Sequence, residues 1–171
     1  MKKVNNPIFP KKVVSNFNFS IQTNSVSIEL NSHAGWVNCV RIGKFTNQFH
    51  NEQEVGKVYF QLVTKLLPFV KEQGERIKHA PHCHLLSGEK RELALSIALK
   101  LHNLSLDDET EVWQLSAGEC IRMIAVITIN GSENVYPLFL DPHHLIYPDK
   151  KHNQMDYSKN ACHFSPNKFY S

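Results

Sequence analysis

Cysteine is scarce in this 171-residue sequence, and its four residues (Cys39, Cys83, Cys120 and Cys162) form no CxxC pair. Such usage is typical of reduced thiols in a cytosolic protein, two or three of them buried as small hydrophobic groups. The first ten residues lack the apolar core of a signal peptide. Apolar runs such as Ile124–Ile129 are too short to cross a bilayer. We therefore expect a cytoplasmic protein without a membrane-bound part.

A strong charge of either sign is also missing, because the formal net charge is +3 with histidines neutral. This surplus permits a nucleic-acid partner without requiring one. Hydrophobic residues make up 42% and charged residues 20% of the chain, as in ordinary globular proteins. We expect a flexible basic arm over residues 1–15, a single domain over 16–148 and a polar C-terminal tail over 149–171.

The N-terminal part of that domain has the period-two alternation of β-strands. Strands are predicted at Phe17–Gln22, Val26–Leu30 and Trp36–Ile42. The Asn24-Ser25 region between the first two suits a tight hairpin turn.

Two helices are predicted in the middle of the chain. Asn51 is a good N-cap, and apolar residues then recur at helical spacing until Gly74. Pro68 lies inside this segment and predicts a kink or a stop before it. A second helix begins at Ser87 and places leucines and Ile97 on one face.

The C-terminal half is rich in strands, predicted at Val112–Leu115, Cys120–Ile129 and Val135–Leu140, with a hairpin turn at Asn130-Gly131. A further strand, Leu145–Tyr147, continues the last of these. The sequence therefore predicts an α+β fold, in which two helices pack on an antiparallel sheet in the order βββ-αα-ββββ.

The densest group of chemically capable residues follows the last long strand: His143, His144 and Tyr147. Histidine and tyrosine can exchange protons or bind phosphate oxygens. Arg122 lies in a strand of otherwise apolar residues, so its guanidinium needs an acid, solvent or a ligand such as phosphate. The alternative interpretation is structural: a histidine that bonds the backbone, a tyrosine that packs on the sheet and an arginine that pairs with an acid.

A histidine-rich loop between the two helices offers a different chemistry. His82 and His84, together with Lys150 and Lys151, are predicted to contact nucleic acid. His79, His82, His84, Cys162 and His163 are also of the types that bind zinc, although their spacings match no common zinc module. A metal site is therefore an alternative, while the main interpretation needs no cofactor.

The segment from Trp113 to Tyr147 resembles the C-terminal sheet of RelE/YoeB-type toxins. Ala117-Gly118-Glu119-Cys120-Ile121-Arg122-Met123-Ile124 is similar to the family's Gly-x-x-Arg strand. Tyr136-Pro137-Leu138-Phe139-Leu140, followed by the histidines and Tyr147, is similar to its last strand. The resemblance implies a RelE-like core with an N-terminal β extension. It also implies RNA, including ribosome-bound mRNA, as substrate and a cognate antitoxin protein as partner.

The function expected from these features is metal-independent RNA cleavage by attack of a ribose 2′-hydroxyl. In it, His143 or His144 is the base, Arg122 stabilises charge on the phosphate, and Tyr147 shares the proton. Two alternatives remain open at this point. One is a non-catalytic, prophage-type module that binds protein or nucleic acid, and the other is a metal-dependent nuclease built on the His/Cys group.

Overall fold

The computed structural model describes residues 26–118, 121–129, 133–148 and 161–170. They form an α+β fold, which confirms the predicted class. A five-stranded sheet has the order β1-β7-β6-β5-β4, and a separate hairpin joins β2 to β3. The strands are β1 (Ser27–Ile28), β2 (Arg41–Ile42), β3 (Phe45–Thr46), β4 (His84–Leu85), β5 (Val112–Leu115), β6 (Arg122–Ile129) and β7 (Glu133–Asp141). The helices are α1 (Glu52–Gln61), α2 (Leu67–Gln73), α3 (Gly88–His102) and α5 (Pro166–Phe169).

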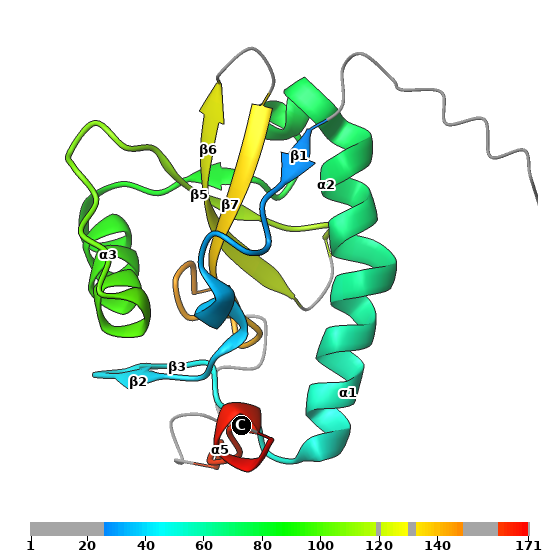
Figure 1. Cartoon of the computed structure of the whole chain (residues 1–171), viewed down its shortest axis with the longest axis vertical. Helices are drawn as coiled ribbons and strands as arrows, with labels where there is room; N and C mark the ends of the chain where they lie inside the picture. Colours follow the sequence, from blue (N-terminus) through cyan, green and yellow to red (C-terminus); the bar gives the residue numbers. More distant parts are fainter. Residues whose placement is uncertain (1–25, 119–120, 130–132, 149–160, 171) are drawn as a thin grey trace, which may run out of the picture.

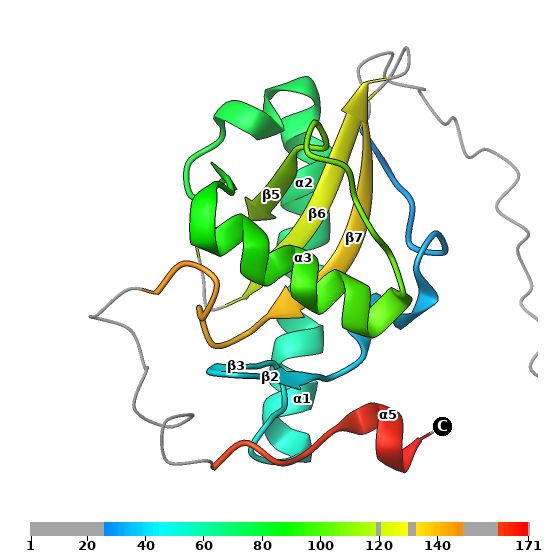
Figure 2. The ribbon, with the colours of Figure 1, turned by 90° about the vertical axis from the view of Figure 1, so that its left-hand side faces the viewer.

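The five-stranded sheet lies between helices in a three-layer arrangement (Figure 1). Alternation along β6 sends Met123 toward the core shared with α1 and α2, and Ile124 toward the core shared with α3. Figure 2 shows α3 lying in front of β6 and β7. Both faces of the sheet are therefore covered, which explains why β6 is almost wholly apolar.

The long helical segment begins as predicted, since the Asn51 side chain accepts a hydrogen bond from Glu54 N–H at 2.9 Å. It continues past Pro68 to Gly74 instead of stopping. A π-helical turn over Leu62–Leu66 precedes the proline, and the Leu67 N–H donates to the Leu62 carbonyl. This wider turn accommodates the missing N–H and the ring of Pro68 without ending the helix.

The sheet is mixed, and not purely antiparallel as predicted. β6 and β7 pair antiparallel, as the hairpin prediction requires, while β1 runs parallel to β7, with Ile28 beside Val135. A bulge at Ile124/Ala125 shifts the register, so that Leu138 and Phe139 both belong to the α3 core. A short strand, β4, also lies between the two helices and changes the expected element order.

Two predicted strands differ from the structure. Residues Ala34–Val37 form a 3-10 turn, in which the Trp36 N–H donates to the His33 carbonyl at 2.8 Å, and the turn buries the Trp36 ring. Residues 145–147 form no strand, because the buried Asp141 carboxylate accepts the backbone N–H groups of Leu145 and Ile146. These two hydrogen bonds turn the chain away from the sheet directly after β7.

Residues 161–170, which the sequence assigns to the polar tail, lie against the domain below the β2–β3 hairpin (Figure 2). Phe164 and Phe49 exchange backbone hydrogen bonds, and Arg41 donates to the Cys162 carbonyl at 2.7 Å. The basic arm, the Phe17–Gln22 strand and the Asn24-Ser25 and Asn130-Gly131 turns fall outside the described residues. Within the described ranges, no helix has the length and apolar character needed to cross a membrane.

Candidate functional site

The candidate site lies on the α3 side of the sheet, where β4 and β5 present a pair of polar residues near Arg122 of β6. His84 is paired with Gln114, and Gln114 with Ile124. Arg122 lies two residues before Ile124 and therefore faces the same side. Its Nη1 donates to Ser116 Oγ at 2.6 Å and to the Ile121 carbonyl at 3.2 Å.

The loop after β5 lies against His82, which comes just before β4. The backbone φ angles of His82 and Gly118 are both positive, at 64° and 84°. A Cβ atom added at Gly118 would lie 3.3 Å from His82 Cδ2, so glycine suits both the backbone conformation and the close approach. The Gly118 N–H donates to Ser116 Oγ at 3.1 Å. Ser116 thus links the loop that supports His82 to the guanidinium of Arg122.

Tyr147 completes the cluster from the segment after β7. Its ring stacks on that of His84, with centroids 5.2 Å apart. Lys90, in the first turn of α3, places its Nζ 3.2 Å from the centroid of the Tyr147 ring. Tyr147 is 43% exposed, and His82 and His84 are exposed as well, so the cluster is open to solvent. We call the residues Arg122, His82, His84, Lys90 and Tyr147 the basic-aromatic cluster.

The electrostatics of this cluster favour a neutral imidazole. Partial burial lowers the pKa of His84 from its ordinary value of 6.5, and the positive charges of His82, Arg122 and Lys90 lower it further. At neutral pH His84 is therefore in its neutral form, which can act as a proton acceptor. Arg122 stays charged at any physiological pH. A base and a permanent cation thus occur together on one open surface.

The two histidines after β7 take different directions. His143 places Nε2 2.6 Å from the Gln48 carbonyl, and its ring centroid lies 6.3 Å from that of His50. His144 occupies the turn with a φ of 58°. The predicted strand Leu145–Tyr147 is absent here, so these side chains do not alternate between two faces of the sheet. The structure associates Tyr147 with His84 and joins His143 to the β3–α1 connection.

Sequence reasoning missed three residues of this site. Lys90, Gln114 and Ser116 are not among the residues that the sequence analysis singles out. A usable signal is the alternation along β5 and into the residue that follows it, which puts Gln114 and Ser116 on the same side of an otherwise apolar segment. The Gln114 side chain is buried, and its Oε1 has no hydrogen-bond partner in the described part of the chain. Lys150 and Lys151 lie outside the described residues.

The predicted metal ligands are distributed over several places. His79 is near Glu133, at the start of β7. The candidate site lies toward the other end of that strand, where Arg122 is opposite Asp141 in the strand register. Cys162 lies beside His50, and His163 is exposed. Among residues 26–118, 121–129, 133–148 and 161–170, no three His, Cys, Asp or Glu side chains are grouped to hold a metal ion. The zinc alternative therefore remains a prediction from residue types alone.

A second cluster combines a thiol, an imidazole and a carboxylate. His50 Nδ1 lies 2.8 Å from Glu54 Oε2, and Cys162 Sγ lies 3.7 Å from Nδ1 and 3.6 Å from Nε2 of the same ring. Nearly equal distances to both nitrogens place the sulfur over the face of the imidazole, since an in-plane position would overlap Cε1. Proton transfer between Cys162 and His50 would need a different ring orientation, and the Cys162 side chain is fully buried.

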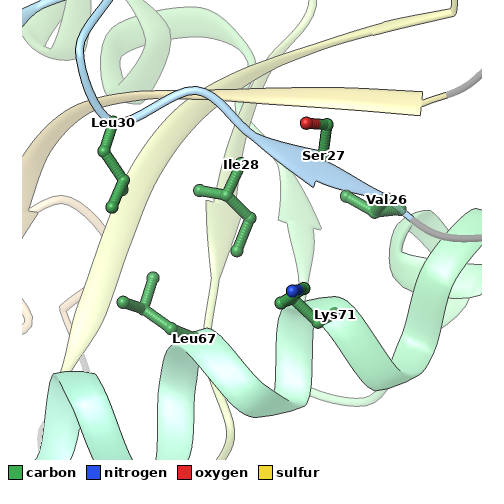
Figure 3. A pocket seen from close by; sticks show the side chains of 6 residues that line it. All are labelled: Val26, Ser27, Ile28, Leu30, Leu67 and Lys71. Carbon is green, nitrogen blue, oxygen red and sulfur yellow. The ribbon is translucent and has the colours of Figure 1, made fainter. Parts of the chain in front are cut away.

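A pocket of about 390 Å³ lies between β1 and α2 (Figure 3). Val26, Ile28, Leu30 and Leu67 form its apolar wall, and Lys71 is its one charged residue. This lining includes no carboxylate, imidazole or thiol. The basic-aromatic cluster is therefore a better candidate for chemistry than this pocket.

Together, the fold and the cluster define an α+β protein with an exposed basic and aromatic site at one end of a covered sheet. The chain belongs to the UU032 family, whose model, described as "Uncharacterised protein UU032", matches residues 32–171. A curated protein of Ureaplasma parvum serovar 3 (strain ATCC 700970), "Uncharacterized protein UU032", is 29% identical over 163 residues. That match covers 92% of this chain and 90% of the relative. No solved structure matches the chain.

Proposed function

We propose that the basic-aromatic cluster binds RNA and cleaves it without a metal ion, by attack of a ribose 2′-hydroxyl on the adjacent phosphate. The observation that carries the proposal is the sheet register, which puts His84 and Arg122 on one face of the sheet, where the exposed Tyr147 ring stacks on His84. The predicted resemblance to RelE/YoeB toxins points to the same chemistry. His84 takes the role of base that the sequence assigns to His143 or His144, because the His143 ring is hydrogen-bonded to the Gln48 carbonyl.

The roles follow from what each side chain can do. His84 takes the proton of the 2′-hydroxyl, and the freed oxygen attacks phosphorus and forms the new P–O2′ bond. Arg122 donates to the non-bridging phosphate oxygens as their negative charge grows. The P–O5′ bond breaks, and the leaving oxygen takes a proton from the Tyr147 hydroxyl, which regains one from water. The products are a 2′,3′-cyclic phosphate and a free 5′-hydroxyl.

His82 and Lys90 assist as binding groups, because both carry donors close to His84. His144 remains a second candidate base, since it belongs to the turn that leads to Tyr147.

The test is cleavage of an end-labelled mRNA fragment in excess chelator, with and without ribosomes. Arg122→Ala and His84→Gln are each expected to slow cleavage at least about 100-fold. Lys57→Ala is the matched control, because Lys57 is an exposed lysine on α1 and its loss removes the same charge. Cleavage that Arg122→Ala leaves unchanged would overturn the assignment.

One observation favours a second candidate, an RNA-binding module without turnover. The exposed stack of Tyr147 on His84, beside Lys90, provides the aromatic and cationic surface on which single-stranded bases stack. In that case Arg122→Ala weakens RNA binding, and the wild-type protein leaves the RNA intact under every condition.

A further inference from the structure

A second hollow lies beside the basic-aromatic cluster and has a volume of about 550 Å³. It is formed by the β2–β3 hairpin, the first two turns of α3 and the segment after β7. Its apolar wall consists of Ile42, Phe45, Leu93, Leu145, Ile146 and Pro148. Lys44, Glu89 and Lys90 supply its charged groups.

The composition of this hollow is that of a small-molecule subsite. Protein pockets for small ligands usually measure roughly 300–1,000 Å³ and combine apolar walls with a few placed polar groups. The pocket has lysines from two different elements, β2–β3 and α3, and the Glu89 carboxylate is exposed beside Lys90. Two cations at an apolar pocket complement a flat apolar ring that is attached to phosphates.

Lys90 connects this pocket to the proposed catalytic surface. It lines the pocket, and its Nζ also lies 3.2 Å from the centroid of the Tyr147 ring. The pocket residues Ile146 and Pro148 are the immediate chain neighbours of Tyr147. An RNA strand whose phosphate is bound by Arg122 and His84 can therefore reach the pocket by passing Tyr147 and Lys90.

We infer that this pocket binds a nucleobase of the RNA, next to the phosphate at the basic-aromatic cluster. The inference rests on the proposed function and adds a specificity subsite to it. The apolar wall accepts the flat ring, while Lys44 and Lys90 contact the flanking phosphates. The Glu89 carboxylate accepts a hydrogen bond from an exocyclic amine. The pocket thus favours the bases that have an exocyclic amine (adenine, cytosine and guanine) over uracil, which has none.

Direct binding tests this inference without any cleavage. The full chain with labelled methyl groups is titrated by NMR with AMP, CMP, UMP and ribose 5-phosphate. AMP and CMP are expected to shift the methyl signals of Ile42, Leu93 and Ile146 and to bind at least about tenfold more tightly than ribose 5-phosphate. Equal affinity of all four probes, or shifts outside the pocket alone, would overturn the inference.

Variants locate the binding. Leu93→Trp fills the pocket and is expected to reduce AMP affinity to that of ribose 5-phosphate, while Leu99→Trp, at a position 52% exposed on the same helix, leaves it unchanged. Glu89→Gln changes an exposed residue and preserves the fold. It is expected to reduce the preference of the protein for CMP over UMP at least threefold, and an unchanged preference would contradict the role of Glu89.

Failure of the subsite and failure of the proposed function are distinguishable. If nucleotides bind in the pocket but the protein cuts no RNA, the proposed catalysis is wrong and the subsite stands. If Arg122→Ala abolishes cleavage but no nucleotide shifts the NMR signals of the pocket, the proposed catalysis stands and the subsite is wrong.

Discussion

His84 and Tyr147 stack face to face, with ring centroids 5.2 Å and ring planes 27° apart. One belongs to β4, between the two main helices, and the other to the turn that follows β7. This contact joins the histidine loop to the C-terminal segment in one site. The chemistry of the site therefore depends on how the environment tunes His84.

The pKa of His84 is expected to rise when Lys90 is replaced by alanine. Partial burial is the largest cause of its lowered pKa, and Lys90 is one of three positive charges that disfavour the imidazolium form. Removal of that charge stabilises the protonated ring, so protonation occurs at a higher pH. NMR titration of the His84 Cε1 proton measures the change.

The same titration gives the control and a link to activity. Lys57→Ala is expected to leave the pKa of His84 unchanged, and an unchanged or lower pKa in Lys90→Ala would contradict the described arrangement. Because His84 acts as a base only when neutral, cleavage by the wild type is expected to fall as the pH drops through its pKa, below 6.5. In Lys90→Ala this fall begins at a higher pH.

Asp141→Ala is expected to destabilise the fold by about 3 kcal/mol, since two buried backbone donors lose a charged acceptor. The fully buried carboxylate accepts the N–H of Leu145 at 3.0 Å and that of Ile146 at 2.8 Å. Urea-induced unfolding measures the loss. Asp141→Asn keeps one acceptor oxygen and should lose less. A loss below about 1 kcal/mol in Asp141→Ala would show that these bonds do not hold the turn.

Native Cys39 is expected to resist alkylation. Burial raises the pKa of its thiol to about 12, against an opposing hydrogen bond from Ser165 and the charge of Lys168. At pH 8 its thiolate fraction is then about 10³-fold lower than that of an ordinary cysteine, and the thiolate is the reactive form. Iodoacetamide labelling, read by peptide mass spectrometry with and without urea, measures the ratio. Similar rates in both states would contradict the burial of this thiol.

Much of the fold could be predicted where local signals decide the structure. Asn51 caps its helix through its own side chain, and Val112–Leu115 forms the strand that its β-branched and apolar residues favour. β6 and β7 are consecutive strands in the sequence, so a turn between them is enough to bring them together as antiparallel partners. In each case the interactions that fix the element lie within a few residues.

The candidate site was less predictable because long-range contacts build it. Arg122 and Tyr147 were recognisable from residue type and context. The end of β7 depends on the buried Asp141 side chain, whose two hydrogen bonds redirect His143 to Gln48 and leave Tyr147 beside His84. No periodicity encodes such a turn. The parallel pairing of Ile28 with Val135 likewise joins distant segments and left no local pattern.

The most direct test of the central claim is cleavage of two otherwise identical RNA strands by the wild-type protein. One strand is all-ribose, and the other has a single 2′-deoxyribose on the 5′ side of the main cut site. If a 2′-hydroxyl is the nucleophile, the modified strand stays intact at that position, and the all-ribose strand gives a 2′,3′-cyclic phosphate. Cleavage of both strands at equal rates would contradict the account.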